Sequence, residues 1–249
     1  MPPHRAGIPI RKCSGISAML LLAVVMAAQA GKQKHSGPEV VRWTKGNSGS
    51  SSSVTTDGKY LYGLKDKDLE ISLAIDAQEL EKVHHRPLPL FAVRIDAHYG
   101  GKAAIELKTD HISLEFVDHY QVVNTSLDPD ELGARIQEDA DNLSDEIEHQ
   151  VRKHPEQKAA EESLLQQHLK DMTDLMGFVS LHSLQPGTLD SGNPDIGGWI
   201  FFSTKSKWIG RWKPQEEFVL RVPLKDSVFE FPFALPPHKG DLILRRRDE

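Results

Sequence analysis

The stretch GGWIFFSTKSKWIGRWKPQEEFVLRVPL, residues 197–224, contains two strongly apolar segments on either side of a basic loop. In the first segment, Trp199 and Phe201 alternate with Ile200 and Phe202, so both faces of an extended chain are apolar. Such a segment is typical of a strand that lies deep in a layered protein, where neither face meets water. The stretch therefore predicts β-structure with a substantial core, and it predicts that Trp199 belongs to that core.

Short strand-like segments of the same kind lie on both sides of this stretch. Glycine, proline and aspartate separate apolar segments at 60–62, 69–73, 90–95, 103–107, 112–117, 178–181, 228–231 and 242–244. Short strands at this spacing, divided by turn residues, are typical of an antiparallel sandwich. We therefore expect one β-sandwich domain built from residues 57–127 and 178–245.

Between residues 127 and 178, apolar residues recur every three or four positions instead of every two. One stripe begins after the helix-start sequence Asp128-Pro129-Asp130 and predicts a helix of about 24 residues, which ends at His154-Pro155. A second stripe follows Pro155 and stops at Gly177. The stripes consist of Leu132, Ile136, Ala140, Leu143, Ile147 and Val151, and of Leu165, Leu169, Met172 and Met176. Two helices with facing stripes predict a long antiparallel helical hairpin inserted at 128–177.

The order of these segments carries a family resemblance. Pro186-Gly187-Thr188-Leu189, a glycine turn, the 198–202 strand and the closing strand 218–222 together resemble uncharacterised immunoglobulin-like domains that bacteria export. The resemblance covers residues 57–123 and 178–235. It implies a mainly β fold, an immunoglobulin-like antiparallel β-sandwich interrupted by the helical hairpin, and it transfers no catalytic residue.

The first thirty residues have the three zones of a secretory signal peptide. Basic residues precede an apolar run at 16–28, and Ala28-Gln29-Ala30 resembles a cleavage site. The run is too short to span a bilayer comfortably, which takes roughly 20 residues. We expect an exported protein, periplasmic or extracellular, without a stable membrane span after cleavage. Anchoring by an uncleaved signal is the alternative. Residues 31–56 are rich in glycine and serine, which predicts a flexible linker.

The charge and the cysteine content restrict the partners. The formal charge is −6, and cleavage after Ala30 would remove three basic residues and give −9. An acidic protein is a poor nucleic-acid binder, because phosphate contacts need clustered lysine and arginine. The one cysteine, Cys13, lies in the predicted signal, so no disulfide is expected.

No catalytic or metal-binding motif is present. There is no Gly-x-Ser-x-Gly elbow and no phosphate-binding glycine loop, so we expect neither a catalytic residue nor a cofactor. Residues 139–150 resemble a calcium loop only faintly, since Ser144 and Gln150 stand where glycine and glutamate are needed. The histidines lack a ligand spacing, so we expect no metal.

Two features are candidates for binding. Trp208 and Trp212, with Lys207 and Arg211, form an aromatic and basic loop that could bind a glycan or a peptide by stacking, or could merely cap an open end of the sandwich. The acidic hairpin could bind a protein partner, or could pack as a decoration. We therefore expect a non-catalytic domain for protein–protein interaction or envelope architecture. The alternatives are a ligand-binding module at the two tryptophans and a periplasmic metal-binding sandwich, which would need at least three converging histidines.

Overall fold

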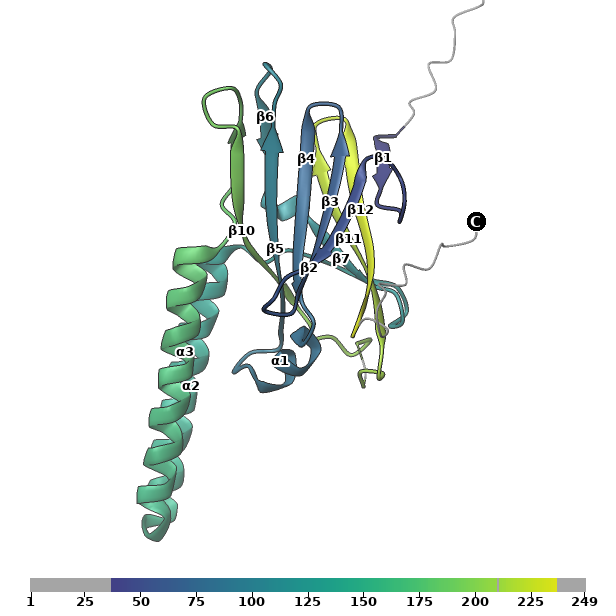
Figure 1. Ribbon diagram of the computed structural model, residues 1–249. Helices are drawn as coiled ribbons and strands as arrows, with labels where there is room; N and C mark the ends of the chain where they lie inside the picture. Colours follow the sequence, from purple (N-terminus) through teal and green to yellow (C-terminus); the bar gives the residue numbers. More distant parts are fainter. Residues whose placement is uncertain (1–36, 210, 237–249) are drawn as a thin grey trace, which may run out of the picture. The chain divides into compact units, whose positions relative to one another are not determined.

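The computed structural model describes residues 37–209 and 211–236. Contacts divide the chain into a unit that ends at Gly37 and a unit that begins at Pro38, and the second unit contains all the described helices and strands. Within the described residues this unit is mainly β, with a long helical part (Figure 1). The predicted signal peptide, residues 1–30, and the predicted strand at 242–244 lie outside the described residues.

The described strands form two five-stranded sheets and one two-stranded sheet. The first sheet has the order β1 (Glu39–Arg42), β12 (Ser227–Leu235), β11 (Glu216–Leu224), β7 (Ser113–Phe116) and β8 (Val122–Thr125). The second has the order β10 (Asp195–Ser203), β5 (Leu90–Tyr99), β4 (Leu69–Asp76), β3 (Lys59–Asp66) and β2 (Ser50–Val54). The small sheet pairs β6 (Ile105–Leu107) with β9 (Gly187–Leu189). All pairs are antiparallel except β1 with β12.

One core fills the space between the two large sheets. In β4, alternate residues from Leu69 to Ile75 are buried, and in β12 alternate residues from Phe229 to Leu235 belong to the core between the sheets. This period of two is what a strand requires when one face lies on a core. At the centre, Phe91 of the second sheet lies against Phe218 of the first, with ring centroids 4.9 Å apart.

The helical arm, which we define as residues 129–182, consists of α2 (Pro129–Lys153), the short η2 (Pro155–Gln157) and α3 (Lys158–His182). Asp128 caps α2, because its carboxylate accepts hydrogen bonds from the backbone N–H groups of Asp130 and Glu131 at 2.9 and 3.1 Å. The two helices run side by side (Figure 1). Their sheet-proximal turns form a second apolar cluster with Leu90, Ala92 and Phe201, the outer face of β5 and β10.

This second cluster explains why the quoted stretch is apolar on both faces. Ile200 and Phe202 face the core between the sheets, whereas Phe201 faces the helical arm. Trp199 is half-buried on the same side as Phe201 and lies edge-on to Phe178 of α3. The prediction of Trp199 as a core residue of the sandwich is thus corrected: it packs under a helix.

Two boundaries differ from those expected. The segment 178–181, predicted as a strand after a stop at Gly177, is the last turn of α3, because Val179 is buried in the cluster under the arm and holds the helix through the glycine. The linker expected at 31–56 is corrected over its described part. Residues 39–42 and 50–54 are β1 and β2, and Trp43 between them is buried in the core.

Some short elements carry no periodic signal in the sequence. They are α1 (Glu79–His85), η1 (Thr109–His111), β8 and β9. None of the helices in the described ranges combines enough length with enough hydrophobicity to cross a membrane.

Candidate functional site

The loop with the predicted ligand-binding residues lies at one end of the two sheets, beside the β7–β8 turn. We call these two segments, residues 117–121 and the described part of 204–215, the rim. Trp208 is 52% exposed, and its ring lies edge-on to that of Tyr120, which is 83% exposed, with centroids 5.8 Å apart. The ammonium of Lys207 lies 4.7 Å from the centroid of the Trp208 ring, a cation–π contact. Arg211 is exposed.

Trp212, by contrast, packs onto the core. Its ring lies 6.0 Å from Phe116 and 6.4 Å from Phe218, measured between centroids. It also meets the edge of the His119 ring at 5.2 Å. Trp208 and Trp212 therefore have different neighbours, one at the surface and one on the core. That Trp208, Trp212, Lys207 and Arg211 bind a ligand stays a prediction.

Beneath Trp212 lies a buried pair, His119 and Glu216. Nε2 of His119 is 3.0 Å from Oε2 of Glu216, and neither atom has a well-aligned hydrogen bond among the described residues. The other oxygen of Glu216 accepts from the backbone N–H of Lys213. These contacts tie the β10–β11 connection to the β7–β8 turn and hold Trp212 in place.

Asp118 adds a third tie at the rim. Its carboxylate accepts from the Lys213 ammonium at 2.7 Å and from the backbone N–H of Glu217 at 3.0 Å. Partial burial works to raise the pKa of Asp118, but these hydrogen bonds outweigh it and hold the pKa below its ordinary value. Tyr120 and Gln121 both have positive φ angles. A glycine usually marks such a turn in a sequence, but the segment Asp118-His-Tyr-Gln contains none. Sequence reasoning therefore missed Tyr120.

The helical arm is the second candidate and has a different character. Residues 129–182 carry thirteen acidic and five basic side chains, or −8, whereas the rest of the chain carries 23 acidic and 25 basic ones, or +2. The whole excess of negative charge thus lies on the arm. Among its described residues, burial is confined to the turns next to the sheets: Leu132, Ile136, Ala140, Met172 and Val179.

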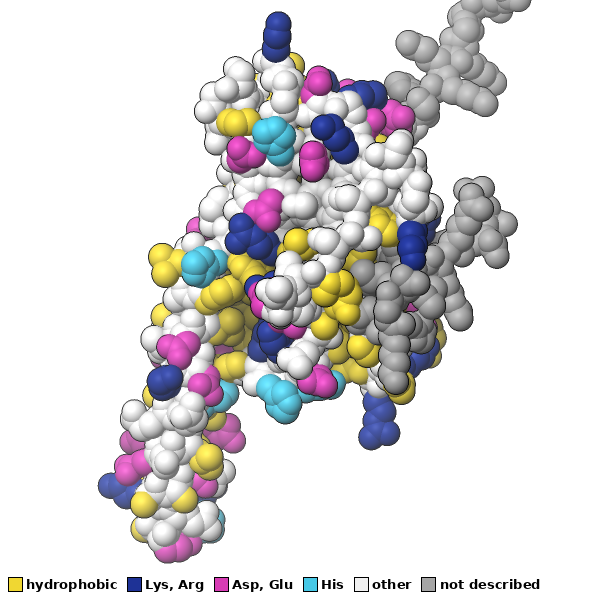
Figure 2. Space-filling model, in the orientation of Figure 1, with side chains coloured by type: hydrophobic (Ala, Val, Ile, Leu, Met, Phe, Trp, Pro, Cys, Tyr) yellow, Lys and Arg dark blue, Asp and Glu magenta, His cyan; other side chains and the backbone are white. Residues whose placement is uncertain are grey.

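Among the described residues, the far half of the arm contributes no side chain to the apolar cluster that the arm forms with the second sheet. Leu143, Ile147 and Leu165 are half-buried in the seam between α2 and α3, and Leu164 is 66% exposed. Exposed i,i+4 ion pairs such as Glu148–Arg152 and Lys158–Glu162 lie on its outer sides. Figure 2 shows the arm as a mixture of acidic, basic and apolar side chains along its length.

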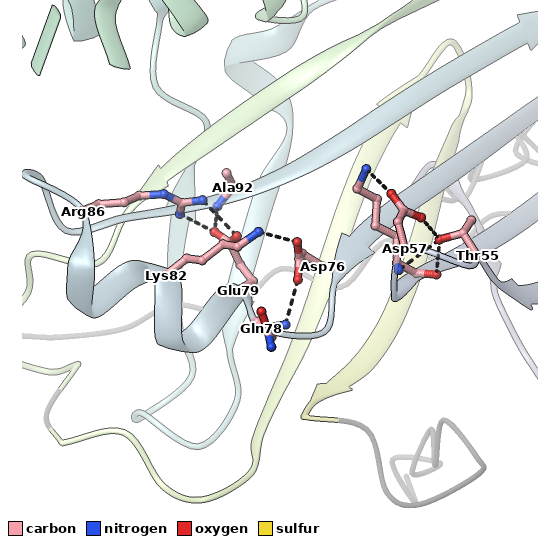
Figure 3. Close-up of polar contacts among 9 residues, drawn as sticks. Thr55, Asp57, Asp76, Gln78, Glu79, Lys82, Arg86 and Ala92 are labelled. Carbon is pink, nitrogen blue, oxygen red and sulfur yellow. Dashed lines mark hydrogen bonds and ion pairs between the residues drawn. The ribbon is translucent and has the colours of Figure 1, made fainter. Parts of the chain in front are cut away.

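A buried ion pair near α1 has a structural role (Figure 3). Glu79 is 1% exposed, and its carboxylate accepts from the Arg86 guanidinium and from the backbone N–H of Ala92 at 2.6 Å. Arg86 also donates to the carbonyl of Leu90 at 2.6 Å. Burial raises the pKa of Glu79, and Arg86 opposes that shift. Because Arg86 and the backbone of Ala92 already provide its hydrogen bonds, this carboxylate holds α1 against β5.

Across the described ranges, no three histidine, cysteine or acidic side chains converge as a metal site would require. No protein-family model matches this chain, and no curated protein or solved structure is detectably similar to it.

Proposed function

We propose that this chain is a non-catalytic exported domain that binds another protein, one with a basic surface, through the far half of its helical arm. The observation that carries the proposal is the separation of burial and charge along the arm. The turns next to the sheets are buried, and the far turns have no described partner other than each other. A charge of −8 over residues 129–182 favours a positively charged partner and opposes pairing of one arm with another.

Two further proposals belong with this one. Export rests on the N-terminal sequence, with its basic start, apolar run and Ala28-Gln29-Ala30. An immunoglobulin-like arrangement rests on the resemblance of the strand order in sequence, and two five-stranded sheets around one core, antiparallel except for the β1–β12 pair, support it.

The test uses a photo-cross-linking residue at two matched positions of the full chain. Leu164 is 66% exposed on the arm, and Val54 is 60% exposed on β2. With cell-envelope extract, we expect a specific product from position 164 and none from position 54. The product should diminish as salt is raised, since exposed charges are screened over about 8 Å at physiological ionic strength.

A charge variant makes the test specific. Neutralising three acids of the arm, Asp145→Asn, Glu146→Gln and Glu148→Gln, should abolish the product without altering the fold, because all three side chains are exposed. The matched control neutralises three exposed acids outside the arm, Glu70→Gln, Glu106→Gln and Asp226→Asn. Equal products from both cross-linking positions, or equal loss in the arm and control variants, would contradict the proposal.

A further inference from the structure

A shallow depression lies on the outer face of the second sheet, over β4, β5 and β10. It has a volume of about 300 Å³, and the polar side chains that line it are those of Glu70, Ser72, Arg94, Asp96, His98 and Asp195. The upper part of Figure 2 shows acidic, basic and histidine side chains on this face, in two groups with an uncoloured strip between them. The helical arm and the rim contribute no lining residue.

The strand register builds this depression from two neighbouring rows. Glu70, His98 and Asp195 are paired across the three strands in one row. Two residues further along each strand, Ser72, Asp96 and Gly197 are paired in the next row and point to the same face. Small residues at both ends of the second row keep the surface low there.

Gly197 has a specific part in the second row. A Cβ atom at this position would lie 2.0 Å from Oδ1 of Asp96, so the carboxylate lies across the glycine. Nε and Nη2 of Arg94 donate to this carboxylate at 3.0 and 2.8 Å. The planar pair Arg94–Asp96 is thereby held in one orientation beside the depression.

The first row contains a similar pair. Nδ1 of His98 is 2.7 Å from Oδ1 of Asp195. A carboxylate has about four acceptor positions and a guanidinium has five N–H donors, so both pairs keep donors and acceptors for a ligand. The Ser72 hydroxyl, at 3.4 Å from the carbonyl of Asp96, adds a group that both donates and accepts.

The charges of the lining select among ligands. Three carboxylates, those of Glu70, Asp96 and Asp195, outnumber the one guanidinium of Arg94, which disfavours phosphate, sulfate and other anions. A bare cation is disfavoured too, because the guanidinium of Arg94 occupies the Asp96 carboxylate, and the described residues offer no cluster of three metal ligands. What fits is a neutral ligand whose groups donate and accept together.

We propose that this depression binds a neutral sugar ring. Vicinal hydroxyls present a donor and an acceptor on adjacent carbons, which match the paired donors and acceptors of Arg94–Asp96 and His98–Asp195. The volume is at the small end of ligand sites, which run from roughly 300 to 1,000 Å³, so the site takes one ring rather than a chain of them. The proposal is independent of the partner of the helical arm.

Nuclear magnetic resonance titration of the full chain tests it. The probes are methyl α-glucoside, methyl α-mannoside, methyl β-galactoside and N-acetylglucosamine, with inorganic phosphate and Ca²⁺ as competing ligand classes. We expect at least one sugar to shift the backbone amides of Ser72, Ala97 and Gly197 in a saturable way. Asp96→Ala should raise the dissociation constant for that sugar at least about tenfold, because the substitution removes a charged hydrogen-bond partner of the ligand.

Two control variants keep the result specific. Asp57→Ala removes an exposed carboxylate at the β2–β3 turn of the same sheet, and Asp226→Ala removes one at the β11–β12 turn of the other sheet; both should bind the sugar as the unchanged protein does. Gly197→Ala, whose Cβ displaces the Asp96 carboxylate, should weaken binding as Asp96→Ala does. The proposal is overturned if none of the sugars shifts these amides, if phosphate or Ca²⁺ alone does so, or if Asp96→Ala keeps full affinity.

Discussion

The two large sheets and the far half of the helical arm differ in what their side chains contact. The sheets present their inner faces to each other, and large side chains such as Phe218 and Phe231 are at most 1% exposed. The far half of the arm has one narrow seam, in which Ile147 and Leu165 are only half-buried. Since stabilisation scales with the apolar area removed from water, the sheets contribute most of the stability of the fold and the far half of the arm contributes little.

The largest effect that we expect separates these two regions directly. Phe231→Ala opens a cavity between the sheets and should lower the free energy of unfolding by about 3–5 kcal/mol. Leu164→Ala, on the exposed side of the arm, should change it by no more than about 0.5 kcal/mol. Urea unfolding followed by tryptophan fluorescence measures both.

A loss at Leu164 as large as the loss at Phe231 would contradict this comparison. It would mean that the far arm packs against the rest of the chain and contributes to its core. Hydrogen exchange gives a second view, since backbone amides of the far arm should exchange faster than those of β4 and β12.

The ion pairs of the two regions differ in the same way. Glu79–Arg86 beside the second sheet is buried on the carboxylate side, whereas Glu148–Arg152 on the arm has both side chains well exposed, at 64 and 70%. Arg86→Met leaves a buried carboxylate without its counter-ion and should cost about 3 kcal/mol at neutral pH. Arg152→Met should cost no more than about 0.5 kcal/mol.

The pH dependence identifies the cause of the loss in Arg86→Met. Burial already raises the pKa of Glu79, and without Arg86 the pKa should rise further above its unfolded value. A raised pKa makes the native state bind the extra proton, so the contribution of Glu79 to stability is greatest below its unfolded pKa and is lost as pH rises through the folded pKa. The deficit of Arg86→Met should therefore shrink on acidification. A deficit that is constant with pH would indicate lost packing of the arginine stem instead.

The sequence predicts well those helices and strands whose apolar residues recur at a regular spacing. Alternation in β4, the doubly apolar β10 and the stripe of α2 each follow from burial on a defined face, and all three are present in the structure. Ser50–Ser53 have no such pattern, since as part of an edge strand they pair with β3 through backbone groups alone. The glycine stop at Gly177 was overridden because Val179 gains burial by remaining helical.

The candidate sites likewise contain some residues that a local sequence pattern indicates and others that it does not. Trp208 is recognisable as a surface aromatic from its basic neighbours, but Tyr120 is brought beside it by a turn with positive φ that lacks the usual glycine. Arg94 and Asp96 are only two residues apart in the sequence, yet the position of this pair beside Ser72 and Gly197 depends on the register of three strands. Long-range register of this kind leaves no local mark in a sequence.

The smallest effect concerns an exposed carboxylate at the turn between β2 and β3 (Figure 3). Hydrogen bonds from Lys59 and from the Thr55 hydroxyl lower the pKa of Asp57 to about 2. A lowered pKa contributes stability that is present above the unfolded pKa and is lost as pH falls toward 2. Lys59→Met should raise the pKa of Asp57 more than Thr55→Val does, because the lysine makes the larger contribution. Carbon-detected titration of the side-chain carboxyl measures the shifts, with Asp226, an exposed acid on another turn, as the unchanged control. If Asp57 keeps a pKa near 2 in both variants, the turn backbone rather than these two side chains holds the carboxylate ionised.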